Sequence, residues 1–259
     1  MPSSPEPGFL GRLLSCRLAD EPKMQTLTRI KLITVKPASG QQVMTSASFF
    51  VTRKGYDCHM EQPPAADVTV AILAGGKSTR MGRDKAFVEF EGRTLLARSL
   101  DLARAISLHV RIIGSGDKFA PFAPVVEDEF PNCGPLGGIH AALRASHTDL
   151  TLILAVDMPF IPRLLLQHLI AQALGAPNAM AVVPRGDAGW QPLCAVYRRK
   201  FAVAAEQALR AGRNKIDLLF DRASTRVIEP DELQRAGFSS DVFRNLNTPE
   251  ELHAQKGSA

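Results

Sequence analysis

The segment 71–86, AILAGGKSTRMGRDKA, combines the residue types that bind phosphate. Its glycines and basic residues include Gly75, Gly76, Arg80 and Lys85. Glycine lets backbone N–H groups approach phosphate oxygens without a Cβ in the way. A guanidinium can bind phosphate through two parallel hydrogen bonds, and an ammonium supplies a compact positive charge. Because the segment directly follows the apolar run 68–73, we interpret it as a phosphate-binding loop rather than a solvated turn with chance basic residues.

A carboxylate stands at the end of a second apolar run. Asp157 follows residues 150–156, LTLILAV, and a charge at the end of a buried strand is costly unless it is paired or bound to a metal. Mg²⁺ prefers oxygen ligands and is usually held by one or two carboxylates together with substrate phosphates. The alternative is that Asp157 caps the helix that begins near Pro162, but it lies too far upstream for ordinary capping geometry.

The segment 125–143, VVEDEFPNCGPLGGIHAAL, is a third loop of unusual composition. Its glycines let the backbone approach a flat base, and the helix that follows offers N–H donors at its N-terminus. Asp128 is the candidate nucleotide ligand here, and the alternative is an ordinary turn or cap aspartate. We expect Cys133 to be a small, half-buried side chain beside this loop.

The chain alternates between short apolar runs and helical patterns from residue 68 onward. The predicted strands are 68–73, 109–113, 124–126, 150–156, 180–183, 193–196 and 225–228, and the predicted helices are 94–106, 136–145, 162–174 and 200–210, with a helical turn at 216–220 and a last helix opened by Thr248 and Pro249. This rhythm predicts an α/β fold, a mostly parallel sheet covered by helices on both faces. Ligands bind beyond the carboxyl ends of such strands, so we expect the three loops to lie close together.

Composition excludes several classes of protein. The chain has 259 residues and a net charge of +5, but residues 1–60 hold eight Lys/Arg against four Asp/Glu, which leaves the rest near neutral. We therefore expect no nucleic-acid partner, because no basic face alternates with aromatic residues. We expect no membrane partner and a cytoplasmic location, since neither a span-length apolar stretch nor a secretory signal is present. Four scattered cysteines favour neither a zinc cluster nor a disulfide framework.

The sequence divides into two parts. Residues 1–64 are rich in Pro, Ser, Gly and Gln around one strand-like stretch, and the linker-like MEQPPAAD at 60–67 joins them to the rest. We interpret them as an N-terminal extension, either poorly ordered or the product of a mis-called start, with Met60 as the true first residue. Residues 65–259 form the predicted catalytic domain.

Several motifs resemble one enzyme family. LAGGKSTRMGRDKA, the ED and GPLGGI of the third loop, VDMP, WQPLCAVY and RNLNTPEEL are similar to the signature segments of the molybdenum cofactor guanylyltransferases. The resemblance covers roughly residues 67–255. It implies a Rossmann-like three-layer α/β/α nucleotidyltransferase fold and transfer of GMP from GTP to molybdenum-bearing molybdopterin. The product would be the guanine dinucleotide cofactor, which molybdoenzymes or their chaperones would receive.

The resemblance also implies roles for individual residues. The catalytic set is Arg80, Lys85 and Asp157; the GTP-binding set is Leu73, Ala74, Gly75, Gly76, Lys85, Asp128 and Asp157; Asp157 is the Mg²⁺ ligand; and Gln191, Asn245 and Asn247 face the molybdopterin. For the two asparagines a turn next to the capping Thr248 explains the motif equally well, and a strand entry explains Gln191.

One position departs from the family pattern. Relatives carry an asparagine that helps to hold guanine where this chain has Gly114. Guanine selectivity is therefore the open point. One alternative is a related nucleotidyltransferase that uses CTP with molybdopterin. Another is a related enzyme that uses a nucleoside triphosphate with a sugar phosphate. A non-catalytic nucleotide-binding protein on the same fold is a more distant alternative, because both Lys85 and Asp157 are present.

Overall fold

A computed structural model describes residues 65–75, 84–221 and 223–246. The expected N-terminal extension, with Met60, lies outside the described residues. So do Gly76 and Arg80 of the phosphate loop, and Asn247 together with the predicted C-terminal helix.

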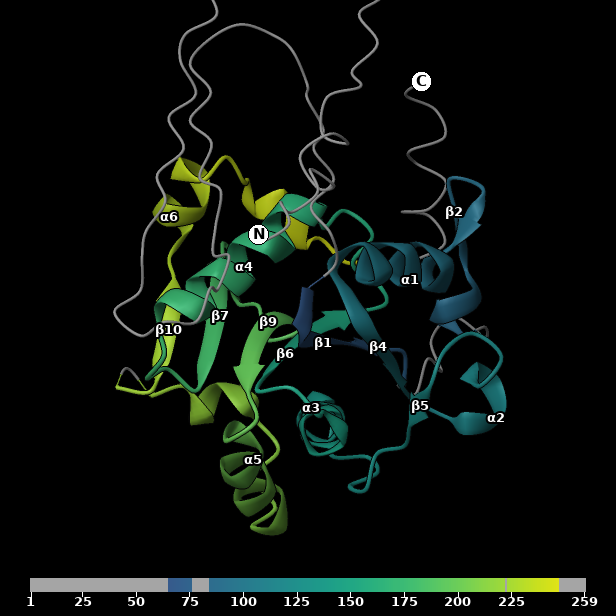
Figure 1. Ribbon diagram of the computed structural model, residues 1–259, viewed down its shortest axis with the longest axis horizontal. Coiled ribbons are helices and arrows are strands. Elements are labelled where there is room, and N and C mark those ends of the chain that lie inside the picture. The colour runs from purple at the N-terminus through teal and green to yellow at the C-terminus, as the bar shows by residue number, and fades with distance from the viewer. Residues whose placement is uncertain (1–64, 76–83, 222, 247–259) are drawn as a thin grey trace, which may run out of the picture. The chain divides into compact units, whose positions relative to one another are not determined.

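The centre of the fold is a sheet in which most strands are parallel (Figure 1). Its order is β10 (Thr225–Ile228), β7 (Ala181–Gly186), β9 (Cys194–Arg198), β6 (Leu150–Ala155), β1 (Ala65–Leu73), β4 (Ser107–Ile113) and β5 (Val125–Val126), with β8 (Gly189–Trp190) paired to β7. The strand β9 runs antiparallel to both β6 and β7, and β8 runs antiparallel to β7. The start of β9 therefore lies at the carboxyl ends of its neighbours.

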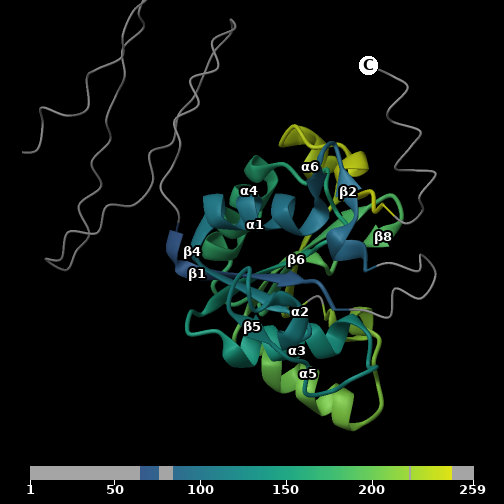
Figure 2. The ribbon, with the colours of Figure 1, turned by 90° about the vertical axis from the view of Figure 1, so that its right-hand side faces the viewer.

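Helices cover both faces of this sheet, as Figure 2 shows. One layer contains α1 (Leu95–Ile106), α4 (Arg163–Gly175) and α6 (Pro230–Arg235), and the other contains α3 (Pro135–Ala145) and α5 (Phe201–Arg210). The predicted α/β class with a mostly parallel sheet is confirmed.

The two faces of β1 explain the three layers. Val68, Val70 and Ile72 are buried in the cluster that contains the α1 and α4 side chains. Ala71 points the other way, into the cluster beneath α3 and α5. Successive strand residues face opposite sides of a sheet, so a strand buried on both faces is largely apolar. The buried Thr69 of β1 is hydrogen-bonded to Ser146 and Thr148.

Most predicted elements agree with the structure to within two or three residues. Thr94 caps α1 by accepting a hydrogen bond from the Ala97 N–H at 3.2 Å, and α4 begins at Arg163 with Pro162 as its N-cap instead of inside its first turn. The sequence analysis missed short elements: η1 (Lys85–Phe87), β2 (Glu89–Phe90), β3 (Arg93–Thr94), α2 (Gly116–Phe119), β8, α6 and η3 (Ser240–Phe243). The predicted turn at 216–220 is η2 (Ile216–Leu219). Elements this short contain too few repeats for periodicity to reveal them.

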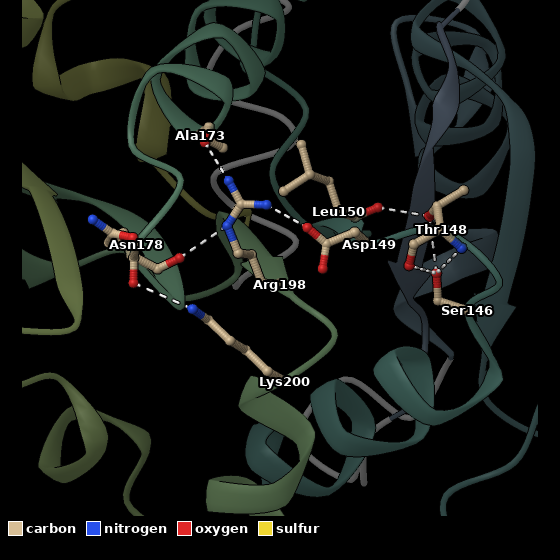
Figure 3. Close-up of polar contacts among 9 residues, drawn as sticks. Ser146, Thr148, Asp149, Leu150, Ala173, Asn178, Arg198 and Lys200 are labelled. Atoms are coloured by element: carbon tan, nitrogen blue, oxygen red, sulfur yellow. Dashed lines mark hydrogen bonds and ion pairs between the residues drawn. The ribbon is translucent and has the colours of Figure 1, made fainter.

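A polar network closes the sheet at the amino end of β6 (Figure 3). The Arg198 guanidinium donates to the carbonyls of Ala173 at 2.8 Å and Ala179 at 3.0 Å, and it pairs with Asp149. Ser146 and Thr148 add hydroxyl hydrogen bonds beside it. These hydrogen bonds satisfy backbone carbonyl groups at and beyond the end of α4. The network lies at the opposite edge of the sheet from the three loops. Within the described ranges, no helix is long and apolar enough to cross a membrane.

Candidate active site

The first loop is fastened to both neighbours of β1. The N–H groups of Ala74 and Gly75 each donate to the Ile113 carbonyl at 3.0 Å. On the other side, the Val156 N–H donates to the Leu73 carbonyl at 3.1 Å. The start of the glycine-rich loop therefore lies between the ends of β4 and β6, as parallel pairing demands.

The end of β4 leads into the third loop. The Gly114 N–H donates to the Val126 carbonyl at 3.0 Å, which joins the β4 end to the β5 end. A Cβ at position 114 would lie only 2.8 Å from the ring of Phe119, whose side chain is buried. A side chain at position 114 would therefore clash with the Phe119 ring unless that ring moved.

Lys85 and Asp157 meet at this edge of the sheet. The Lys85 Nζ lies 3.0 Å from the Asp157 Oδ2, and the two side chains are 25% and 19% exposed. The short helix η1 presents the lysine: Asp84 caps it by accepting from the Ala86 N–H at 3.1 Å, and Lys118 of α2 binds the same aspartate at 3.1 Å. Two predicted catalytic residues are therefore brought together.

Asp157 does not cap α4. The N-cap of that helix is Pro162, which makes no side-chain capping bond, and the Asp157 carboxylate points to Lys85 instead. Its carbonyl accepts a hydrogen bond from the Leu246 N–H at 3.0 Å. The C-terminal segment thus lies directly against the loop that carries the carboxylate.

Asp128 has a turn role and rests on the start of α3. Its Oδ1 accepts a hydrogen bond from the Phe130 N–H at 2.8 Å, which is the ordinary turn role that the sequence left open. A Cβ at Gly137 would lie 2.8 Å from this Oδ1 and closer still to Oδ2, so the carboxylate rests on the first turn of α3. Burial raises the pKa of Asp128, although the Phe130 hydrogen bond and the charge of His140 oppose the rise.

The entry into α3 depends on glycine. Gly134, its N-cap, has φ of +71°, a left-handed conformation that side chains rarely adopt. Gly138 packs against Leu73, with 3.4 Å between the position of a Cβ and Leu73 Cδ2. The third loop therefore lies over the end of β1, and the half-buried Cys133 is part of it, as predicted.

Gln191 lies at the same edge of the sheet because β9 is antiparallel. Its backbone N–H donates to the Pro184 carbonyl at 2.9 Å, and its side-chain amide donates to the Gly189 carbonyl at 3.4 Å. Gly186 lies close to the side chains of both Gln191 and Phe243. A Cβ at this glycine would lie 3.2 Å from the Gln191 Nε2 and 3.3 Å from the Phe243 ring. Two of the predicted molybdopterin residues, Gln191 and Asn245, thus come from segments that meet at Phe243.

The C-terminal segment also carries Arg244, to which the sequence analysis assigned no role, next to the predicted Asn245. The Arg244 guanidinium carbon lies 4.5 Å from the centre of the Phe160 ring. The neighbouring Asn245 has a buried Oδ1 without a hydrogen-bond partner. Both features depend on the contact of this segment with the Asp157 loop, which no local pattern signals.

The carboxylates of this site fit a metal ion only in part. Among the residues that the structure describes, no group of three or more His, Cys, Asp or Glu could hold a metal. Asp157 offers a carboxylate at the end of β6 beside Lys85, whereas the Asp84 carboxylate is engaged with the Ala86 N–H and Lys118. This suits Mg²⁺ that arrives with a nucleotide and keeps its phosphates as ligands, and it does not suit an ion caged by protein.

The fold and the site define a class of protein. A three-layer α/β/α fold with a glycine-rich loop, a lysine and an aspartate at the carboxyl edge of its sheet is typical of Rossmann-like nucleotide-binding domains. Residues 70–227 match the family described as the MobA-like NTP transferase domain. The chain belongs to this family.

This chain matches curated relatives over most of their length. The chain is 31% identical over 188 residues to a probable molybdenum cofactor guanylyltransferase of Carboxydothermus hydrogenoformans, which covers 71% of this chain and 92% of the relative. It is 32% identical over 199 residues to the molybdenum cofactor guanylyltransferase of Vibrio cholerae, covering 74% and 93%. The predicted resemblance is therefore confirmed.

Solved structures agree with the fold. Molybdopterin-guanine dinucleotide biosynthesis protein A of Archaeoglobus fulgidus superposes with a TM-score of 0.62 at 28% identity, covering 73% of this chain and 97% of that protein. A CMP:2-keto-3-deoxy-manno-octonic acid synthetase complexed with CTP superposes with a TM-score of 0.54 at 12% identity, covering 74% and 98%. The second likeness shows the shared fold alone.

Proposed function

We propose that this protein transfers GMP from GTP to molybdenum-bearing molybdopterin, forming the guanine dinucleotide cofactor and pyrophosphate. The curated relatives named molybdenum cofactor guanylyltransferase support the substrates. The observation that carries the proposal is the ion pair of Lys85 with Asp157 at the carboxyl edge of the sheet. A lysine and a carboxylate held beside a phosphate-binding loop are what a nucleotidyltransferase needs.

The chemistry needs positioning and charge neutralisation. The terminal phosphate of the pterin attacks the α-phosphorus of GTP in line, and pyrophosphate leaves with the bonding electrons. The attacking phosphate is already ionised, so no general base is required. The loop amides, Arg80 and Lys85 would stabilise the charge that grows on the departing pyrophosphate. Asp128, over the first turn of α3, would bind the nucleoside side of GTP.

Asp157 would hold the Mg²⁺ of the bound nucleotide. The ion would supply neutralisation of phosphate charge that Lys85 alone does not provide. In the described structure the two side chains neutralise each other at 3.0 Å. In the nucleotide complex, Asp157 would hold the ion and the Lys85 ammonium would contact the phosphates.

Because position 114 departs from the family pattern, the choice of nucleotide is tested directly. The purified protein is incubated with Mg²⁺, molybdenum-loaded molybdopterin and each of the four nucleoside triphosphates, and the dinucleotide is sought by mass spectrometry. Product with GTP alone, lost in Asp157→Ala, supports the proposal. Product with CTP alone would assign the protein to cytidylyl transfer, and no product with any nucleotide would reject the pterin as acceptor and direct the assay to sugar phosphates.

Transfer of the product to molybdoenzymes or their chaperones and a cytoplasmic location remain predictions. Both concern steps outside the site, and co-purification of the protein with a molybdoenzyme, together with cell fractionation, would test them.

A further inference from the structure

Two arginines flank a pair of aromatic rings, and only one of them is neutralised. Phe90 and Phe160 meet edge to face, with centroids 5.5 Å apart. Arg98 lies over Phe90 at 5.0 Å and pairs with Glu91 at 2.9 Å. Arg244 lies over Phe160 at 4.5 Å, is exposed, and forms no ion pair with any residue in the part of the chain that the structure describes.

The position of Arg244 is set by contacts with the Asp157 loop. Phe160 is three residues beyond Asp157. Arg244 is two residues before Leu246, whose N–H binds the Asp157 carbonyl at 3.0 Å. The Phe160 ring and the Leu246 hydrogen bond therefore hold Arg244 beside the loop that carries the Asp157 carboxylate, although Arg244 is distant from that loop in sequence.

Stacking on a ring prepares a guanidinium to bind an anion. The ring fixes the plane of the guanidinium and restricts its side-chain motion, so less conformational entropy is lost when it binds. Its N–H groups stay available at the edges of that plane, where they can bind two oxygens of one phosphate. An unpaired, immobilised arginine at the rim of a site has the chemistry of a phosphate receptor.

The two reactants of the proposed reaction repel each other. The nucleophilic phosphate must approach the α-phosphorus from the side opposite the departing pyrophosphate. The glycine-rich loop and Lys85 would hold the pyrophosphate side, so the acceptor phosphate needs a separate cation. The C-terminal segment, with Arg244 and Asn245, lies against the Asp157 loop through the Leu246–Asp157 hydrogen bond, and the inference places the acceptor phosphate beside this segment.

We infer that Arg244, stacked on Phe160, binds the terminal phosphate of the acceptor and aligns it for attack. This inference rests on the proposed function and adds an acceptor-side contact at Arg244, the first residue of the motif RNLNTPEEL, to which the sequence analysis assigned no role. It explains why an exposed arginine at the site rim is packed on an aromatic ring of the metal-binding loop.

The test separates acceptor binding from nucleotide binding. In Arg244→Ala we expect the KM for the molybdopterin acceptor to rise about tenfold or more, the loss expected for a charge-assisted contact, with the KM for GTP within about twofold. Phe160→Leu keeps the charge but removes the ring, so a smaller rise of about threefold is expected. Arg98→Ala is the matched control, because it removes a ring-stacked arginine that is already neutralised, and both KM values should stay near those of the wild type.

Direct binding keeps the two proposals distinguishable. Binding of metal-free molybdopterin to the nucleotide-free protein is followed by pterin fluorescence, and Arg244→Ala should weaken it while Arg98→Ala should not. An unchanged acceptor KM and affinity in Arg244→Ala, or a rise confined to the KM for GTP, would overturn the inference and leave the proposed function intact. A wild-type protein that neither binds nor converts the pterin would overturn both.

Discussion

The ammonium of Lys85 lies 3.0 Å from the carboxylate of Asp157, although the two residues are 72 positions apart in sequence. Lys85 is delivered by a short helix after the first loop, and Asp157 by the turn after β6. Their meeting follows from the pairing of β1 with β6, which aligns Leu73 with Ala155. Parallel strands bring their carboxyl ends to one edge, so distant residues form one site.

Removing either charge of this pair should abolish activity without unfolding the protein. Asp157→Asn and Lys85→Met should each lower kcat/KM for GTP by about a hundredfold or more, the scale of losing one group that stabilises the transition state. A partly exposed pair contributes only about 0–1 kcal/mol to stability, so the melting temperature should change little. Either variant at near wild-type activity would exclude the pair from catalysis.

Neighbouring glycines at the start of α3 should respond differently to alanine. Gly137→Ala places a Cβ against the Asp128 carboxylate and should displace it, weakening GTP binding by about tenfold. Gly138→Ala is the matched control, because its Cβ would meet the Leu73 and Ile113 side chains at ordinary contact distances of 3.4 Å and 3.6 Å. Both changes favour the helix, so neither should unfold it. Equal GTP affinities by calorimetry would show that Asp128 does not need this position.

Asp128→Asn should separate the turn role from the charge. The amide oxygen can still accept from the Phe130 N–H, so the turn should persist. Burial raises the pKa of Asp128, which means that the folded state pays a desolvation cost for the ionised form at neutral pH. Unfolding free energy should therefore stay constant or rise slightly, while GTP binding weakens. A large loss of stability in denaturant titrations would show that the carboxylate is structural.

Gly114→Ala should destabilise the fold. The added methyl group meets the buried Phe119 ring at 2.8 Å, and overpacking of this kind costs about 1–3 kcal/mol. Phe119→Leu in the same chain should recover part of that loss by making room. Thermal unfolding of the single and double variants measures the coupling, and simple addition of the two effects would contradict the contact.

His168 should make stability depend on pH. Burial lowers its pKa, the charge of Arg226 adds to this, and Glu232 opposes it; the ring also packs near Phe238. An unfolded chain binds the proton at the ordinary pKa, so the stability that neutral His168 contributes is present above about pH 6.5 and is lost as the pH falls below it.

The measurement is the unfolding free energy at about pH 7.5 and pH 5.5, on either side of the ordinary histidine pKa. The decrease between them should be smaller in His168→Gln than in the wild type. The same decrease in both proteins would assign the pH dependence to other groups.

The local sequence was sufficient for the elements that position the site. The largely apolar runs at β1 and β6 predict strands buried on both faces, because a parallel strand covered by helices on both sides needs apolar residues at successive positions. The glycines, Lys85 and Asp157 at the ends of those runs then predict a phosphate site by chemistry alone. The motifs around them were specific enough to indicate the family.

The tertiary structure determined which residues from distant segments are in contact across the site. Only the fold placed Phe119 against Gly114, Asp128 on Gly137, and Arg244 on Phe160. It also reversed β9, which brings Gln191 to the carboxyl edge. Patterns in a sequence report the local period of burial, whereas these contacts join residues from loops whose conformations depend on packing between distant elements, and no local repeat encodes them.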